Sequence, residues 1–535
     1  MKKLITLFLA LIMSVSTFTA IGCGNKKDSK DPSDTLVIDI QIGGYGTKWL
    51  EDIKDAYVEK TGKTVTVTPL GSTTESESAL LAGRTSTDIY FTMDPLIGHQ
   101  YAPKTINGET YDCLMEDLTS FIENDKIEGE NKSIKDKINP QYLEYFKINR
   151  LDGTQKIYTL PWSIGLLGLV KNNDVWQEGW KVPNTTDKFI ELLDQIKEDG
   201  YVPLAYSKDY HYYNYLLETF ATQYEGVENM AQLWEAKLPK DDPDYKDEID
   251  KTFLAYYEGV QHAYEVMVEL MQSEQVGGQV QSKYHYSVNS KDHIGTQTFF
   301  LDSNYKIAMM MSGDWIQNEM KDTFANPNLE FIKTPVISAL GDKLGITDDQ
   351  LSAIIDYVDG TVENEPAFES TVGLTNEQVI EKVREARNIV PTNSNSMAFY
   401  IPAYSNAKDL AKDFIKFMLS DEGLAIYQSS LGYAMPYDYE WTKEGNSSKM
   451  SNFINKAYND FYYGKTLYPT EREKSEIFAR STLRLYDNHD KQFVVEFSKY
   501  PLEGTPAEVA EDYFAADYTE ISRKWNDYKS SAGIR

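Results

Sequence analysis

The chain has 535 residues and a formal net charge of −30, and aromatic side chains make up 13% of it. Such an acidic body repels nucleic acid and anionic lipid headgroups, so we expect neither as a partner. The length predicts two or more lobes rather than a single core. With only two cysteines, one of which we expect to be lipidated, no intramolecular disulfide is expected to stabilise the fold.

The N-terminal segment predicts export and tethering to a membrane. An apolar run, Leu4–Val15, follows a short basic start and is too short to span a bilayer as a helix. Ala20-Ile21-Gly22-Cys23 resembles the bacterial lipobox, in which the cysteine carries diacylglycerol. We therefore expect a signal peptide over residues 1–22, lipid on Cys23, and a flexible polar stalk up to residue 34. An ordinary secretory signal that contains a cysteine is the alternative.

This arrangement predicts a protein held on the extracellular face of the cell membrane, as Gram-positive lipoproteins are. No other stretch of the sequence approaches the length of an apolar membrane span.

The next hundred residues predict an α/β unit. An alternating β-branched strand, Leu36–Ile42, precedes a glycine-rich turn and an amphipathic helix, Thr47–Lys60. Further elements are expected in the order strand (65–67), helix (76–82) and strand (88–91). Alternating strands and helices indicate a parallel sheet, in which ligands bind beyond the carboxyl ends of the strands. Here those ends are Gly43–Gly46 and Thr92–Asp94.

A second unit begins near Lys156. The pattern predicts its strands at 156–160, 165–171, 306–311 and 329–337, and its helices at 186–198, 213–224 and 252–271. Residues 341–390 look inserted, and two helices in them begin at capping boxes, Thr347–Gln350 and Thr375–Gln378. This segment is interpreted as a decoration of a lobe or as a surface for a partner. Helices are expected at 406–419 and 422–430, and the last hundred residues are Tyr-rich and mostly helical in pattern.

Three stretches together resemble the family 1 extracellular solute-binding proteins, the sugar-capturing receptors of ABC importers. The first stretch is the strand and turn at Ala308–Met320. The second is Lys156–Asp174, which contains the sequence TLPWSIGLLGLVKNND, and the third is Ser396–Leu424. The inserted segment and the long C-terminal region depart from the family pattern. The resemblance implies a non-catalytic monomer without a cofactor, which captures an oligosaccharide and delivers it to the membrane subunits of a permease.

The resemblance also implies an α/β fold of two lobes with mixed or parallel sheets, closing about a hinge. The crossings between lobes are expected near 162–165, 331–336 and 419–432. The expected division is residues 35–160 and 331–420 (with the insertion) in the N-terminal lobe, and residues 161–330 and 421–535 in the C-terminal lobe.

Eight residues are candidates for the ligand site between the lobes: Trp315, Asp314, Tyr45, Asp94, Trp162, Tyr212, Tyr213 and Tyr433. Aromatic rings pack against the C–H faces of sugars, while carboxylates accept from hydroxyls. Five of these residues also have a purely structural interpretation. Trp315 could cap a lobe core, and Trp162 could pack in the hinge. Asp314 could cap the following helix, Asp94 could cap a turn, and the glycines around Tyr45 could serve only the strand-to-helix turn. We expect one of Tyr212 and Tyr213 to contact the ligand, and the pattern does not decide which.

The rival class is an exported carbohydrate-active hydrolase. Carboxylates are abundant, but in an acidic chain such pairs carry no specificity. No GxSxG or HExxH motif occurs, and the six histidines show no metal-ligand spacing. A receptor for a non-sugar solute such as a peptide, and a surface adhesion or scaffold protein, are further alternatives.

Overall fold

The computed structural model describes residues 34–71, 82–83, 86–93, 103–106, 108–150, 153–207, 212–287, 292–393, 397–469, 476–483, 485 and 504–534. The signal peptide, Cys23, most of the stalk, Asp94 and nearly all of the helix predicted over 76–82 lie outside the described residues. No helix in the described part of the chain is both long enough and apolar enough to cross a membrane.

The first lobe is built on a five-stranded sheet in the order β2-β1-β3-β17-β8. Its strands are β1 (Thr35–Gln41), β2 (Thr64–Leu70), β3 (Ile89–Thr92), β8 (Leu160–Pro161) and β17 (Ala398–Tyr400). β1 pairs in parallel with β2 and β3, while β17 pairs antiparallel with β3 and β8. β1 buries Leu36, Ile38 and Ile40 at alternate positions, as its pattern predicted.

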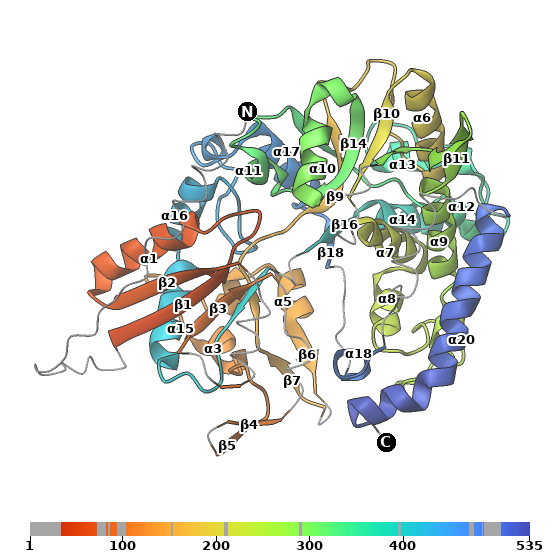
Figure 1. Ribbon diagram of the computed structural model, residues 1–535. Helices are drawn as coiled ribbons and strands as arrows, with labels where there is room; N and C mark the ends of the chain where they lie inside the picture. The colour runs from red at the N-terminus through yellow and green to blue at the C-terminus, as the bar shows by residue number, and fades with distance from the viewer. Residues whose placement is uncertain are drawn as a thin grey trace, which may run out of the picture.

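Helices cover this sheet because their apolar positions recur at helical spacing. α1 (Lys48–Thr61) buries Trp49, Leu50, Ile53 and Tyr57 and ends at Gly62, whose φ of 70° is in the left-handed region. α15 (Lys408–Met418) and α16 (Asp421–Leu431) pack beside α1. In Figure 1 they lie with the red strands of this lobe.

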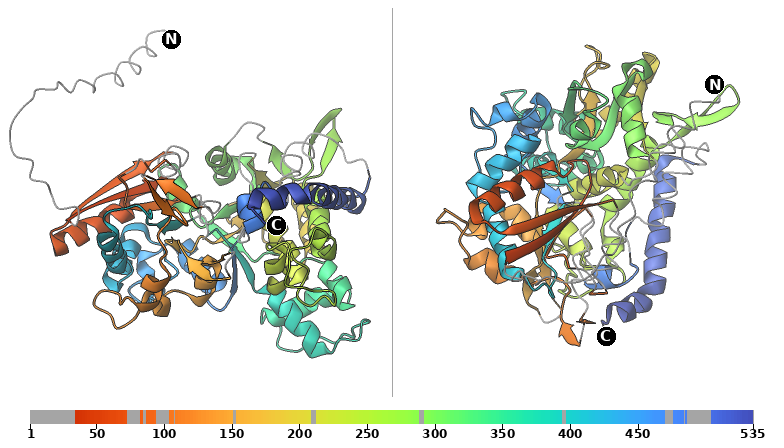
Figure 2. Two further views of the ribbon diagram at one scale, coloured as in Figure 1. Left: turned by 90° about the horizontal axis from the view of Figure 1, so that it is seen from below. Right: turned by 60° about the vertical axis from the view of Figure 1, so that its left-hand side comes forward.

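The second lobe repeats the same strand plan. Its sheet has the order β13-β10-β14-β9-β15, from β9 (Leu167–Asn172), β10 (Val202–Tyr206), β13 (His285–Ser287), β14 (Ile307–Gly313) and β15 (Leu329–Ile332). In both sheets the first three strands in this order are parallel, and the earliest of them in the chain lies in the middle. The fourth strand runs antiparallel to both of its neighbours. The predicted α/β fold with two mixed sheets is therefore confirmed, and Figures 1 and 2 show the sheets in separate halves of the molecule.

The helices of the second lobe are α6 (Thr186–Glu198), α7 (Tyr212–Glu225), α8 (Val227–Leu233), α9 (Glu258–Leu270) and α10 (His293–Leu301). The single helix predicted over 252–271 is wrong in its first turn. A short 3-10 helix (Phe253–Tyr256) comes before α9, and Tyr257 between them is non-helical. Tyr257 is fully buried and its hydroxyl donates to the carbonyl of Lys237 at 2.9 Å, so tertiary packing overrides the local helical pattern.

The chain passes between the lobes in places that only partly match the expected crossings. The connection from β8 to β9 crosses as expected, and Leu166 on it forms a β-bridge with Thr392. β16 (Ile389–Thr392) leads back toward β17, and it pairs in parallel with β18 (Thr466–Pro469). A third passage runs from α16 to α17 (Asn452–Phe461), which packs on β15.

Two segments therefore lie in the opposite lobe from the one expected. β15 stays hydrogen-bonded to β9, and the chain continues into α12 (Ala339–Leu344), α13 (Asp348–Val358) and α14 (Asn376–Arg387). α12 and α14 pack on α7 in the second lobe, and α13 packs on α12 and α14. α16 packs on α1 in the first lobe. Both capping boxes expected in the 341–390 segment are present, at the starts of α13 and α14.

The C-terminal region completes the second lobe. α20 (Pro506–Ala532) lies along α9 and α18 (Glu476–Arg480), and Figure 1 shows it at the outer edge of the molecule. Tyr264 of α9 donates to the Asp517 carboxylate of α20 at 2.5 Å, which joins the two helices by a buried hydrogen bond.

Arg387 provides a test of how the 341–390 segment is held together and joined to the lobe. Its buried guanidinium donates to Asp359 at 2.8 Å and to the carbonyl of Thr334 at 2.8 Å. We expect Arg387→Leu to lower the free energy of unfolding by roughly 3 kcal/mol, because it removes one partner of a buried ion pair. Urea denaturation measures this. Arg384→Leu is the matched control, since the Arg384 side chain forms an exposed pair with Glu381 and its loss should shift stability by less than about 0.5 kcal/mol. Equal effects of the two substitutions would contradict this role of Arg387.

Candidate functional site

The carboxylate of Asp314 is bound by tyrosines from both lobes. Asp314 directly follows β14 of the second lobe and is fully buried. Tyr45, in the turn after β1 of the first lobe, donates its hydroxyl to one carboxylate oxygen of Asp314. Tyr458 of α17 donates to the other oxygen at 3.3 Å, and Tyr433 donates to the backbone carbonyl of Asp314 at 3.0 Å. Groups far apart in sequence therefore meet at the junction of the lobes.

Aromatic rings surround the Tyr45 side of this contact. The ring centroid of Tyr45 lies 5.4 Å from Trp162, 6.0 Å from Trp315 and 5.1 Å from Tyr433, each edge-on. Trp162, on the crossing from β8 to β9, stacks on Trp49 at 5.2 Å with an interplanar angle of 19°. We call Tyr45, Trp49, Trp162, Asp314, Trp315, Tyr433 and Tyr458 the interlobe cluster. Its members are between 0% and 4% exposed.

A close backbone approach brings the two lobes together at this point. A Cβ on Gly44 would lie 2.8 Å from Cβ of Trp315 and 2.8 Å from a carboxylate oxygen of Glu319. Only glycine therefore fits between the turn after β1 and α11 (Ile316–Met320). Asn318 of α11 donates to the carbonyl of Gly44 at 2.6 Å. The glycine-rich turn thus serves contact between the lobes as well as the strand-to-helix turn.

Burial changes the proton affinity of the acidic groups at this junction. It raises the pKa of Asp314 to about 7, although the tyrosine hydroxyls lower it in part. Burial and the Asp314 charge raise the pKa of Tyr45 well above its ordinary value, so Tyr45 remains a hydrogen-bond donor. Burial also raises the pKa of Glu319 to about 7, against a hydrogen bond that Gln297 donates to it at 2.7 Å. Near neutral pH both carboxyl groups change charge readily.

Of the eight predicted residues, five meet in the interlobe cluster, and Tyr212 lies beside it. The ring of Tyr212 is stacked on His293 at 4.0 Å and lies 6.3 Å from Trp315. Tyr213 points elsewhere, because neighbouring positions on a helix are about 100° apart. Its hydroxyl donates to the carbonyl of Ala205 at 3.0 Å, and its ring packs on His285 within the core of the second lobe. Asp94 lies outside the described residues.

Three residues of the junction carried no sequence prediction of a site. Trp49 lies within the predicted amphipathic helix, and Glu319 lies within the stretch Ala308–Met320 without having been singled out. Tyr458 lies 144 residues from Asp314 in the chain, and nothing local distinguishes it from the other tyrosines of its region. No group of three or more potential metal ligands occurs within the described residues.

The raised pKa of Asp314 predicts how stability depends on pH. A carboxyl with a higher pKa in the folded state binds more protons folded than unfolded between its ordinary value of 3.8 and about 7, so the free energy of unfolding falls as pH rises across that range. We expect Asp314→Asn to reduce the fall measured by urea denaturation between pH 5 and pH 7.

Part of the fall in the free energy of unfolding should remain in Asp314→Asn, because the pKa of Glu319 is also raised to about 7. Asp359→Asn is the control. Burial by itself raises the pKa of Asp359, but Arg387 and Lys333 lower it by a larger amount. The pKa of Asp359 therefore lies below its ordinary value. The control should therefore lower stability without changing the slope. An unchanged slope in Asp314→Asn would contradict the assignment.

Comparison with solved structures shows that most of the chain matches a known fold. RafE in complex with raffinose matches with a TM-score of 0.53 and 14% identity, over 91% of this chain and 99% of RafE. The solute receptor AcbH, described as exclusive for β-D-galactopyranose, matches with a TM-score of 0.54 and 14% identity, over 92% and 100%. A probable secreted solute-binding lipoprotein from Streptomyces coelicolor matches with a TM-score of 0.55 and 12% identity, over 93% and 100%.

A search of curated proteins finds no match to the sequence. The family model for the bacterial extracellular solute-binding proteins matches residues 42–425, which is most of the chain. Members of this family are non-catalytic receptors of ABC transporters, so the expectation of a receptor rather than a hydrolase is confirmed. The chain belongs to the bacterial extracellular solute-binding proteins.

Proposed function

We propose that the protein captures an oligosaccharide at the interlobe cluster and delivers it to the membrane subunits of an ABC importer. The observation that carries this proposal is the meeting of Tyr45, Trp162 and Trp315 around one buried carboxylate. One of these residues comes from each lobe, and Trp162 comes from a crossing segment. A ligand held among them would contact every part of the molecule that moves when the lobes close.

The chemistry of the cluster suits a sugar. Indole and phenol rings pack against C–H faces, and the tyrosine hydroxyls and the Asp314 carboxylate exchange hydrogen bonds with sugar hydroxyls. Three further polar atoms at the junction are buried without a hydrogen-bond partner within the described residues: Nε1 of Trp49, Oγ of Ser312 and Oε1 of Gln297. Donors and acceptors of this kind are costly to bury unpaired, and sugar hydroxyls would satisfy them.

The proposal requires the lobes to separate before ligand enters, because the cluster is almost fully buried. Separation breaks the hydrogen bond from Tyr45 to Asp314 and withdraws the Gly44 turn from α11. The freed carboxylate and rings then face the ligand, and closing excludes water from around it.

Two of the solved structures with this fold are described as binding sugars. RafE holds raffinose and AcbH takes β-D-galactopyranose, but at 14% identity the likeness extends to the fold alone. A non-sugar solute such as a peptide remains the second candidate. Calorimetric titration with a panel of oligosaccharides, followed by peptides, separates the two, and tight binding of a peptide with no binding of any saccharide would overturn the sugar proposal.

Trp315 provides the direct test of the site. We expect Trp315→Ala to weaken binding of the saccharide more than tenfold, because it removes a stacking surface of about 1 kcal/mol or more together with its burial. Calorimetry measures the dissociation constant. Trp176→Ala is the matched control, since Trp176 packs on Trp180 and Lys171 in the same lobe and belongs to none of the cluster contacts. Equal affinities of Trp315→Ala and the control would remove Trp315 from the site.

We also propose that lipid on Cys23 anchors the receptor to the extracellular face of the membrane. The lipobox-like sequence before Cys23 supports this, and one solved structure of the same fold is described as a secreted lipoprotein. A tether of this kind keeps the receptor near its permease in a cell that has no outer membrane, as in a Gram-positive bacterium.

Fractionation of cells tests the anchor. We expect Cys23→Ala to move the protein from the membrane fraction to the medium while leaving its affinity for ligand unchanged. Cys113→Ala is the matched control, because Cys113 is buried in the first lobe and burial raises its pKa to about 12, which keeps the thiol unreactive. Retention of Cys23→Ala on membranes would overturn the proposed anchor.

A further inference from the structure

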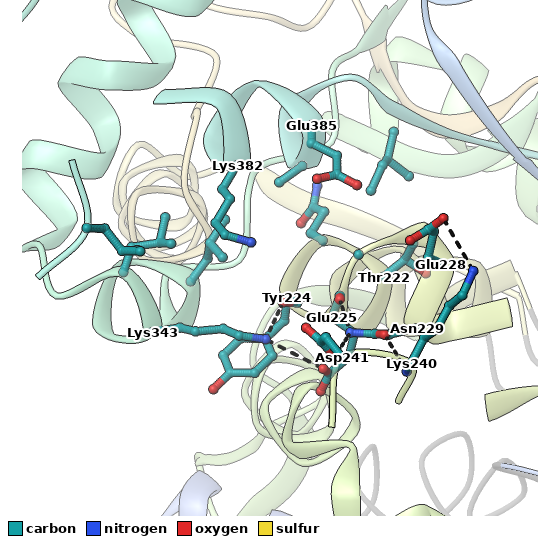
Figure 3. Close-up of a pocket in the computed structure, with 17 residues that line it drawn as sticks. Thr222, Tyr224, Glu225, Glu228, Asn229, Lys240, Asp241, Lys343, Lys382 and Glu385 are labelled. Carbon is teal, nitrogen blue, oxygen red and sulfur yellow. Dashed lines mark hydrogen bonds and ion pairs between the residues drawn. The ribbon is translucent and has the colours of Figure 1, made fainter. Parts of the chain in front are cut away.

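A separate pocket lies within the second lobe, away from the interlobe cluster. Its volume is about 550 Å³, which is within the range of small-molecule sites. α7 and α8 form one side, and α12 and α14 of the 341–390 segment form the other (Figure 3). None of the interlobe cluster residues lines it. The 341–390 segment, which the family resemblance left unexplained, therefore helps to enclose a cavity.

The wall of the pocket toward the 341–390 segment is largely aliphatic. It is lined by Leu340, Leu344, Leu374, Ala386 and Ile389. An aliphatic wall favours a ligand that has an apolar portion of its own.

Both sides of the pocket also carry charges that neighbouring groups hold in place. The ammonium of Lys343 donates to the carbonyl of Tyr224 at 2.8 Å, lies 4.2 Å above the ring of Tyr224, and is 3.5 Å from the carboxylate of Glu225. Glu225 in turn accepts from the backbone N–H of Gly259 at 2.6 Å. Asn229 donates to Asp241 at 2.9 Å. These groups form a preorganised polar surface rather than free side chains.

Three other groups at the pocket have bonding capacity left. The side chain of Gln223 is buried, with the residue 4% exposed; its oxygen accepts from the N–H of Ile337 at 3.0 Å, but its amide nitrogen has no partner within the described residues. Lys382 and Glu385 project from α14 over the opposite side of the pocket in Figure 3. The structure shows no hydrogen bond or ion pair for either side chain in the part of the chain that it describes. A buried donor, an ammonium and a carboxylate thus line one cavity.

We propose that this pocket binds a small zwitterion with an aliphatic body, which is the chemistry of an aliphatic amino acid or a short aliphatic peptide. The ligand carboxylate would pair with the Lys382 ammonium and the Gln223 amide, and the ligand ammonium with Glu385. Its aliphatic side chain would pack on Leu340 and Leu344. A pure anion would meet the carboxylates of Glu225 and Asp241, and a pure cation would meet Lys343, so neither fits the mixed lining as well.

The test uses the purified protein titrated with L-leucine and with trileucine, without any saccharide present. We expect saturable binding at one site for at least one of these probes. Tighter binding of L-leucine identifies the ligand as a free amino acid, and tighter binding of trileucine identifies it as a peptide. Acetylated leucine amide, which lacks both charges, should not bind. If neither charged probe binds at millimolar concentration, the proposal is overturned.

Substitutions then place the binding in this pocket. Lys382→Ala and Glu385→Gln should each weaken it about tenfold, since each removes a charge-assisted hydrogen bond. Gln223→Glu keeps the acceptor for Ile337 but replaces the free donor by a carboxylate oxygen, so it should abolish binding of the ligand carboxylate. Arg384→Ala and Glu381→Gln are the matched controls, because both side chains lie on α14, pair with each other and do not line the pocket.

Unchanged affinity in all three pocket variants would overturn the assignment. Circular dichroism confirms that Gln223→Glu remains folded, and the two α14 variants keep the test decisive if it does not. The saccharide affinity of these variants should equal that of the unchanged protein, so failure here and failure of the interlobe proposal are distinguishable.

Discussion

The contact between Tyr45 and Asp314 is the interaction on which the closed arrangement of the lobes depends. It joins the turn after β1 to the residue after β14, so it links the two sheets directly. Asp314 is fully buried, and a buried carboxylate is tolerated only when its oxygens are satisfied. Tyr45 and Tyr458 supply those donors. Opening the lobes removes the hydrogen bond from Tyr45, but it also lets water hydrate the carboxylate. These two contributions to the free energy of opening partly offset one another.

The repeated strand plan explains why this contact occurs where it does. In each sheet three parallel strands end at the same edge, and the turn after β1 and the residue after β14 are both such ends. Loops beyond the carboxyl ends of parallel strands are the usual ligand-binding positions of α/β sheets. When two such sheets face each other across crossing segments, both sets of loops converge. Trp162, which lies on a crossing segment, then completes the aromatic surface between them.

The 341–390 segment adds a second kind of site to the same lobe without disturbing the first. The ion pair between Arg387 and Asp359 joins two of its helices to one another. The hydrogen bond from Arg387 to the carbonyl of Thr334 and the packing on α7 anchor them to the lobe. α7 therefore has two roles, since Tyr212 at its start approaches Trp315 and Gln223 near its end lines the pocket. A helix packed on both sides in this way offers a rigid connection between the two regions.

Local patterns in the sequence determined several strands of the two large sheets, among them β1, β3, β9 and β14. They also determined the longer helices, the capping boxes of α13 and α14, and the aromatic and acidic residues that follow β1 and β14. Period and capping chemistry are local properties, which is why these predictions succeeded. Lobe membership of α14 and α16, the break before α9, and the choice of Tyr212 over Tyr213 were decided only by tertiary packing. The same is true of Tyr458 and of the pocket beside α14, because the chain must fold before residues more than a hundred positions apart become neighbours.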